Sequence, residues 1–140
     1  MITKQIGEHT HILVLETGDE VVEGLLRFAA DHDLSDAHFT AIGGFNHVTL
    51  GYFDWSIKDY NHIPVDEQVE ALSLIGDITL RDDRPWVHAH VVLGLSDATT
   101  RGGHLIAGTV RPTLEVMLDE SPVHLQRRFD PESHAALIRF

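Results

Sequence analysis

Three histidines in the second half of the sequence are spaced so that they could bind one metal ion. His88 and His90 are two residues apart in an apolar run, and His104 follows after a polar loop and the pair Gly102-Gly103. On a β-strand, residues two apart point to the same face of the sheet. If the two segments form an antiparallel hairpin that pairs even-numbered with even-numbered residues, His104 joins the other two. A one-residue slip would send it to the opposite face.

Three imidazoles suit a divalent transition metal. The chain has no cysteine, so its metal ligands must be nitrogen or oxygen atoms. Neutral imidazoles favour zinc, with iron, nickel or copper as alternatives. Three protein ligands leave a fourth coordination position open, as in catalytic zinc sites, where bound water becomes acidic near neutral pH. The alternative interpretation is that His88 and His90 are half-buried histidines that hydrogen-bond to neighbours in a sheet.

Two further groups of residues could take part in such chemistry. Glu115 lies in an apolar stretch, where a carboxylate costs free energy unless it is paired. It could orient a metal-binding histidine, act as a general base or pair with Arg111, or it could simply face outward from the polar side of a strand. His9 and His11 form a second His-x-His pair, which has no obvious third ligand.

The elements that must position these residues are mostly strands. The apolar spacing predicts one helix, from Asp19 to Leu34, with Thr17 or Asp19 as its N-cap. Gly43-Gly44 and Gly76 are expected to mark bulges or tight bends in strands. Alternating or continuous apolar runs predict strands over residues 9–16, 37–42, 48–55, 67–80, 86–93, 103–110, 114–118 and 123–129.

This order of elements predicts the fold class. Because no alternation of strands and helices follows the one helix, the class is α+β, with a large, mostly antiparallel sheet of about seven to eight strands and one main N-terminal helix. The chain length and the lack of a linker or repeat predict that residues 1–140 form a single domain.

The charge of the chain narrows the classes of partner. A formal net charge of −12 opposes non-specific binding to nucleic acid and to anionic membranes. The sequence shows no apolar stretch of membrane-spanning length and no signal peptide. We therefore expect a cytoplasmic location and no membrane partner.

Five motifs follow one another between residues 51 and 116. They are Gly51-Tyr52-Phe53-Asp54, Leu72-Ser73-Leu74-Ile75-Gly76-Asp77-Ile78, His88-Ala89-His90, Gly102-Gly103-His104-Leu105 with Gly108, and Thr113-Leu114-Glu115-Val116. This order resembles the plants-and-prokaryotes-conserved (PPC) domain family in its short, stand-alone prokaryotic form. The resemblance implies an α+β fold with a large antiparallel sheet, a homotrimer, and the family's usual description as a candidate DNA-binding protein.

The resemblance also has limits that bear on function. The DNA-binding description comes largely from plant members, which carry an AT-hook with an Arg-Gly-Arg-Pro core outside this domain, and Arg101-Gly102-Gly103 is not such a motif. The fold of the family is similar to acetolactate decarboxylase, which holds zinc with a His-x-His pair and a later histidine. Carried over, that pattern falls on His88, His90 and His104, although the spacing before the third histidine differs.

These residues and the resemblance support three functional hypotheses. The first is a trimeric PPC-domain protein with a three-histidine site for zinc, or else iron or nickel, and a small-molecule-binding or regulatory role. The second is a DNA-binding or DNA-associated transcriptional regulator. The third is a zinc-dependent lyase or hydrolase resembling acetolactate decarboxylase, in which Glu115 is the catalytic acid or base.

Overall fold

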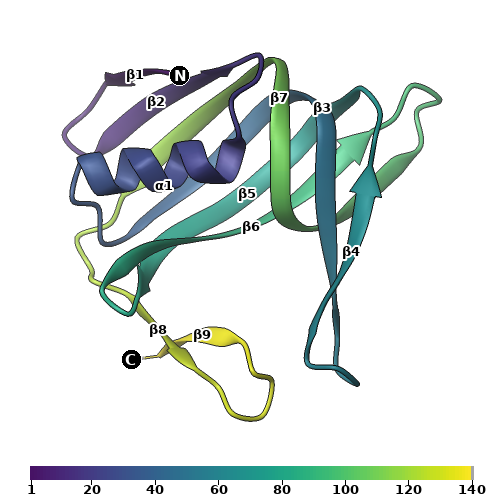
Figure 1. The fold of residues 1–140 in the computed structure, drawn as a ribbon. Coiled ribbons are helices and arrows are strands. Elements are labelled where there is room, and N and C mark those ends of the chain that lie inside the picture. Colours follow the sequence, from purple (N-terminus) through teal and green to yellow (C-terminus); the bar gives the residue numbers. More distant parts are fainter. Residues whose placement is uncertain (140) are drawn as a thin grey trace.

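The computed structural model describes residues 1–139, which form one helix and nine strands (Figure 1). The predicted class, α+β with a large and mostly antiparallel sheet, is confirmed, with one or two strands more than expected. The elements are β1 Ile2–Gln5, β2 Thr10–Glu16, α1 Val21–Asp31, β3 Ala37–Asp54, β4 Asp59–Val65, β5 Val69–Arg81, β6 Arg84–Gly94, β7 Thr100–Glu120, β8 Gln126–Phe129 and β9 Ala136–Arg139.

The helix α1 is shorter than the sequence predicted at both ends, and its N-cap is a different residue. Glu20 is the cap: its Oε2 accepts a hydrogen bond from the backbone N–H of Glu23 at 2.7 Å. Its Oε1 accepts from the backbone N–H of Gly108 in β7 at 2.8 Å. Asp19, one of the two predicted caps, instead pairs with the N-terminal ammonium group at 2.9 Å. One carboxylate thus begins the helix and fixes it to the sheet.

Two strands, β3 and β7, are much longer than predicted because bulges bend them without ending them. The predicted strands 37–42 and 48–55 are the two halves of β3, and 103–110 and 114–118 both lie in β7. The predicted bulge at Gly43-Gly44 is confirmed, since the register of β3 shifts there against both neighbours. Gly43 has a φ of 149°, which other residues rarely adopt, and a side chain there would clash with the backbone of Thr113.

Gly76, by contrast, is not a bulge. It pairs in regular register with Phe39 of β3 and Ala89 of β6, and the irregularity in β5 lies between Ala71 and Ser73. The glycine serves close packing instead, as described below for the candidate site.

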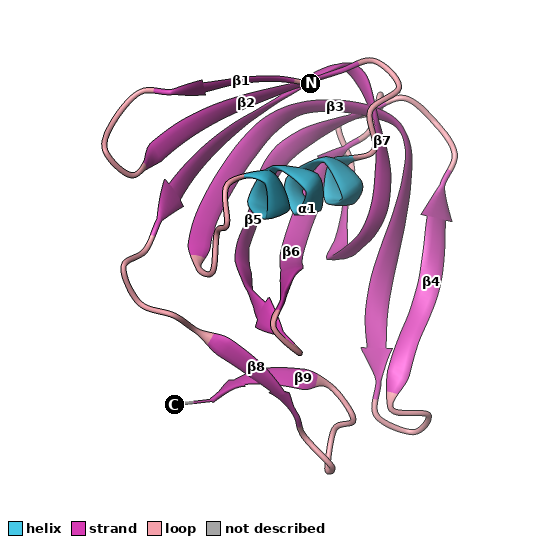
Figure 2. Cartoon of the chain, turned by 60° about the vertical axis from the view of Figure 1, so that its left-hand side comes forward, coloured by secondary structure: helices cyan, strands magenta, loops and turns pink. Residues whose placement is uncertain are grey.

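Four antiparallel pairings form a closed circuit through β3, β5, β6 and β7. The sheet extends beyond this circuit through β2 and β1 on one side and through β4 on another, while β8 joins β5 by a short parallel pairing and continues into β9. Figures 1 and 2 show the strands curving around α1, with the β8–β9 hairpin at the end of the molecule nearest the β5–β6 turn. Within residues 1–139, no helix has the length and apolar character needed to cross a membrane.

The core lies between α1 and the inner face of the curved sheet. The helix buries Val21, Leu25, Phe28 and Ala29, and it packs against β6 and β7. Along β6, Ala89, Val91 and Leu93 are buried in this core. Alternation along the strand therefore places His88 and His90 on the outer face. The two faces of β6 have the orientation that the sequence predicted.

Candidate metal centre

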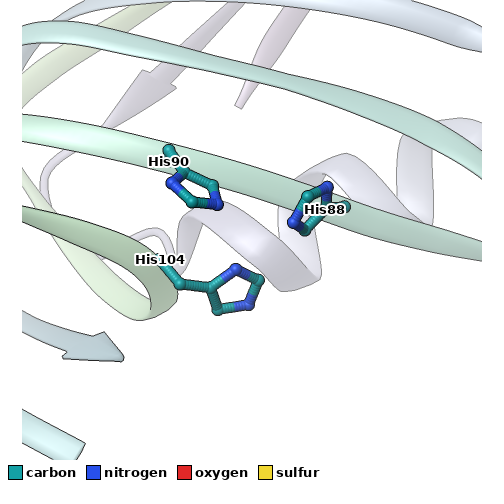
Figure 3. Close-up of side chains that lie close together, drawn as sticks. All are labelled: His88, His90 and His104. Carbon is teal, nitrogen blue, oxygen red and sulfur yellow. The ribbon is translucent and has the colours of Figure 1, made fainter. Parts of the chain in front are cut away.

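His88 and His90 of β6 and His104 of β7 converge on the outer face of the sheet (Figure 3). His90 lies directly opposite His104 in the β6–β7 pair, so the strands have the even-to-even register that the cluster requires. The ring centroids are 5.3 Å apart for His88 and His90, 5.2 Å for His88 and His104, and 5.5 Å for His90 and His104. One ring nitrogen from each residue lies within 4.8 Å of the others. Neighbouring nitrogens around a tetrahedral zinc ion are roughly 3.4 Å apart, so small side-chain rotations would close the cluster on an ion.

A glycine beneath the cluster lets β5 and β6 pack closely where His88 begins. A Cβ atom added to Gly76 would lie 2.5 Å from the carbonyl oxygen of His88, 2.6 Å from the ring of Phe39 and 2.8 Å from the Cβ of Ala89. No real Cβ contact is so short, so any larger residue would push β6 away from β5. The position of His88 thus depends on a residue that is not itself part of the cluster.

Asp77 and Arg127 stand behind His88 and were not identified from the sequence as site residues. Nη2 of Arg127 donates to both carboxylate oxygens of Asp77, at 2.7 and 3.0 Å, and lies 3.3 Å from Nδ1 of His88. Oδ2 of Asp77 is 3.6 Å from the same Nδ1. Burial raises the pKa of Asp77, but the interactions with His88 and Arg127 outweigh it and hold the pKa below its usual value. A carboxylate beside the ring nitrogen is the arrangement that orients metal-binding histidines.

His104 is held in a neutral state. Its ring stacks on Tyr60 of β4 with centroids 4.5 Å apart, and its Nδ1 is buried without a hydrogen-bond partner among the residues described. Burial, followed by the charges of His88, His90 and Arg127, lowers the pKa of His104 to about 4. Burial and His88 also lower the pKa of His90. At neutral pH both rings therefore carry free lone pairs, which is the form that binds metals.

A cleft of about 290 Å³ opens beside His88 and His104. Tyr60 and Trp86 form part of its wall, and the β8–β9 hairpin contributes Arg127 and Leu137. The histidines are therefore reachable by a small molecule.

Glu115 does not come near the histidines. It is exposed on β7, eleven residues along the strand from His104, and it lies opposite Val14 of β2 and Ile42 of β3. Glu115 is not among the described residues that line the cleft, and within residues 1–139 it makes no ion pair with Arg111. The carboxylate beside the cluster is that of Asp77, and a signal for it was present in the sequence: an acidic residue inside an apolar strand.

The second His-x-His pair does not form a comparable group. His11 is buried and packs edge-on against the ring of Phe28, with centroids 5.3 Å apart. His9 is exposed, with Glu8 and Glu120 at 3.8 and 3.9 Å. Among the described residues, the one group of three possible ligands is His88, His90 and His104.

Comparisons with known structures agree with this architecture. The metal-containing protein AF0104 from Archaeoglobus fulgidus is 30% identical, with a TM-score of 0.87, and the match covers 100% of this chain and 99% of that one. A candidate DNA-binding protein from Ralstonia eutropha is 29% identical, with a TM-score of 0.87 and coverage of 93% and 90%. Comparison with curated proteins gives no match.

A more distant likeness confirms the expected relation of the fold to acetolactate decarboxylase. Alpha-acetolactate decarboxylase from Bacillus subtilis is 12% identical, with a TM-score of 0.54 over 79% of this chain, which matches only 51% of the decarboxylase. At that identity the likeness concerns the fold alone. The family model of the Plants and Prokaryotes Conserved domain, in contrast, matches residues 3–122. This chain therefore belongs to the Plants and Prokaryotes Conserved domain family.

Proposed function

We propose that this protein binds a divalent transition metal through His88, His90 and His104, with zinc preferred over iron or nickel. The observation that carries the proposal is the convergence of three imidazoles, one of which has a buried nitrogen without a hydrogen-bond partner among residues 1–139. An unsatisfied buried polar atom costs about 1–3 kcal/mol, and coordination of a metal would remove that cost. The metal content of the Archaeoglobus relative, which is 30% identical, is consistent with this assignment.

We also propose a role in binding a small molecule or in regulation. A metal held by three imidazoles keeps a coordination position for an outside ligand. The cleft beside His88 and His104 gives such a ligand access and walls to contact. Asp77 and Arg127 hold His88 in place from behind, and stacking on Tyr60 holds His104. The site is thus rigid on the protein side and open on the other.

Metal analysis tests the proposal directly. Protein purified without chelator, loaded with zinc and desalted should retain one zinc per chain. The variants His104→Ala and His90→Ala should lose most of it. The matched control is His9→Ala, because His9 belongs to the other His-x-His pair and lies outside the cluster. Wild-type protein that retains no more zinc than His104→Ala would contradict the proposal.

The exposed side chains on the outer face support association between copies of this chain, for which the family resemblance implies a homotrimer. Ile42 of β3, Ile75 of β5 and Met117 of β7 are 61%, 55% and 43% exposed. Thr40 pairs with both Ile75 and Met117, so these residues belong to adjoining strands of one surface. Exposed apolar side chains gathered on one face of a sheet are a feature of sites of protein association.

A DNA-associated regulator is the second candidate, favoured by the description of the Ralstonia relative, which is 29% identical. The net charge of −12 weighs against direct binding, because DNA-binding surfaces neutralise phosphates with clustered basic residues. A duplex mobility-shift assay at low salt separates the candidates. Direct binding predicts a shift that weakens steeply as salt rises, and the absence of a shift would leave only association with DNA through a partner.

A further inference from the structure

The cleft beside the histidines has a charge opposite to that of the whole chain. Among the described residues that line it, Lys58, Arg81 and Arg127 are basic and Asp59 is the one acidic residue. The chain as a whole has 10 basic and 22 acidic residues, so this concentration of positive charge is unusual for its surface. A divalent ion on the histidines would add to it. The cleft therefore favours an anion.

Of the two arginines of the cleft, Arg81 is the one that is free to meet a ligand. The donors of Arg127 are already occupied by Thr79, Asp77 and the carbonyl oxygen of Ala136, so this side chain serves to hold the wall. The guanidinium of Arg81 lies 4.6 Å above the ring of Trp86, and its one ionic neighbour in the described chain is Asp82 at 3.9 Å. An arginine stacked on an aromatic ring keeps its donor edge available for a carboxylate.

The walls of the cleft suit a flat, apolar body. Tyr60 stacks on His104 with ring centroids 4.5 Å apart and meets Phe53 edge-on at 5.4 Å. Trp86 lines the cleft on the β6 side and Leu137 on the hairpin side. The volume of about 290 Å³ is at the lower end of the range for small-molecule sites, which limits the ligand to about one ring.

The β8–β9 hairpin forms one wall of the cleft and lies beyond the part of the chain that the family model matches. That match ends at residue 122, whereas Arg127 belongs to β8 and Ala136 and Leu137 belong to β9. Arg127 joins the hairpin to β5 through Thr79 and Asp77. One wall of the cleft is thus supplied by a segment that the family model does not cover.

We infer that the cleft binds a small organic carboxylate with a flat apolar body, with its carboxylate between Arg81 and the histidine cluster and its body between the aromatic residues and the hairpin. The inference rests on the proposed metal site, because the bound ion contributes part of the positive charge. The ligand class follows from the charge and the shape of the cleft together. A neutral ligand of the same shape should bind poorly.

Benzoate is the probe, measured by calorimetric titration of the zinc-loaded full chain after its zinc content has been determined. Benzoate should bind with millimolar or tighter affinity, and the uncharged isostere benzamide should bind at least about tenfold more weakly. Arg81→Gln should weaken benzoate binding about tenfold, the usual effect of losing one charge-assisted hydrogen bond. Arg84→Gln is the matched control, since Arg84 pairs with Arg81 across the β5–β6 turn but does not line the cleft.

Leu137→Asp tests the hairpin wall. It should weaken benzoate binding while the zinc content stays at that of wild type. Zinc-loaded protein that fails to bind benzoate, or binds benzamide equally well, would overturn the inference. So would equal effects of Arg81→Gln and Arg84→Gln. If the chain takes up no zinc, the metal proposal fails, and titration of the zinc-free chain then decides whether the cleft alone selects the anion through Arg81.

Discussion

Arg127 donates from Nη2 to both carboxylate oxygens of Asp77, across a separation of 50 residues in the sequence. The same guanidinium donates from Nε to Thr79 at 2.9 Å and from Nη1 to the carbonyl oxygen of Ala136 at 3.1 Å. One buried side chain therefore connects β8, β9 and β5, next to the strand that carries His88. The C-terminal hairpin and the candidate metal site form one structural unit.

Removal of this side chain should destabilise the chain. We expect Arg127→Ala to lower the free energy of unfolding by about 2–4 kcal/mol, because Asp77 and Thr79 lose their partner in a largely buried position. Urea denaturation at neutral pH measures the loss. The neighbouring Arg128→Ala is the control and should change stability by less than about 0.5 kcal/mol, since Arg128 is exposed. Equal stabilities of the two variants would show that the buried network contributes little.

The arrangement of the three histidines was predictable because it depends on local pattern. On β6 the buried residues Ala89, Val91 and Leu93 alternate with the histidines, and this burial fixes which face each residue takes. The partner strand β7 follows β6 after a short loop, so the two strands were expected to pair and only the register of the pairing was left open. The register places His104 opposite His90.

The surroundings of the histidines were not predictable from such patterns. Asp77 comes from β5, Tyr60 from β4 and Arg127 from β8, and periodicity within a segment does not say which strands become neighbours. The parallel β5–β8 pairing that brings in Arg127 has no turn or hairpin signal, because it joins distant parts of the chain. The predicted strands near Gly43-Gly44 were too short for a different reason. Glycine is equally compatible with the end of a strand and with a bulge inside it.

The pKa of His104 predicts how stability should change with pH in the metal-free chain. Burial first, and then nearby positive charge, lowers this pKa from 6.5 to about 4 in the folded state. Between these values the unfolded chain takes up a proton that the folded chain does not, so stability falls as the pH drops from 6.5 towards 4. After discounting for solvent exposure of the ring, we expect a loss of about 1–2 kcal/mol.

The measurement is urea denaturation at both ends of this pH window, with chelator present, on wild type and His104→Gln. Other histidines titrate in both proteins, so the informative quantity is the difference between their two losses. His104→Gln should lose less stability on acidification than wild type. Identical losses would mean that the ring of His104 takes up its proton as readily in the folded chain as in the unfolded one.

Gly76→Ala should disturb the site without touching any histidine. The added methyl group would overlap the backbone of His88 and the ring of Phe39, so we expect a destabilisation of about 1–3 kcal/mol and a weaker affinity for zinc. Denaturation and competition with a chromophoric chelator measure the two effects. Gly7→Ala is the control, because its nearest neighbour is a side-chain atom of Thr10 at 3.3 Å, which can move aside. Unchanged zinc affinity in Gly76→Ala would show that the position of His88 tolerates movement of β6.

Ile75→Asp should separate the proposed trimer into single chains. Ile75 is 55% exposed on the outer face, where an aspartate costs the isolated chain little, but in a packed interface three unpaired carboxylates would be buried. Light scattering coupled to size exclusion measures the change in mass. Ile57→Asp is the matched control: it makes the same substitution at a residue 59% exposed, in the turn between β3 and β4 and away from the outer face. The prediction fails if wild type is already a single chain or if both variants keep the mass of wild type. Because Ile75 lies opposite His90 across the β5–β6 pair, a trimer that depends on Ile75 would also place the metal site close to the subunit interface.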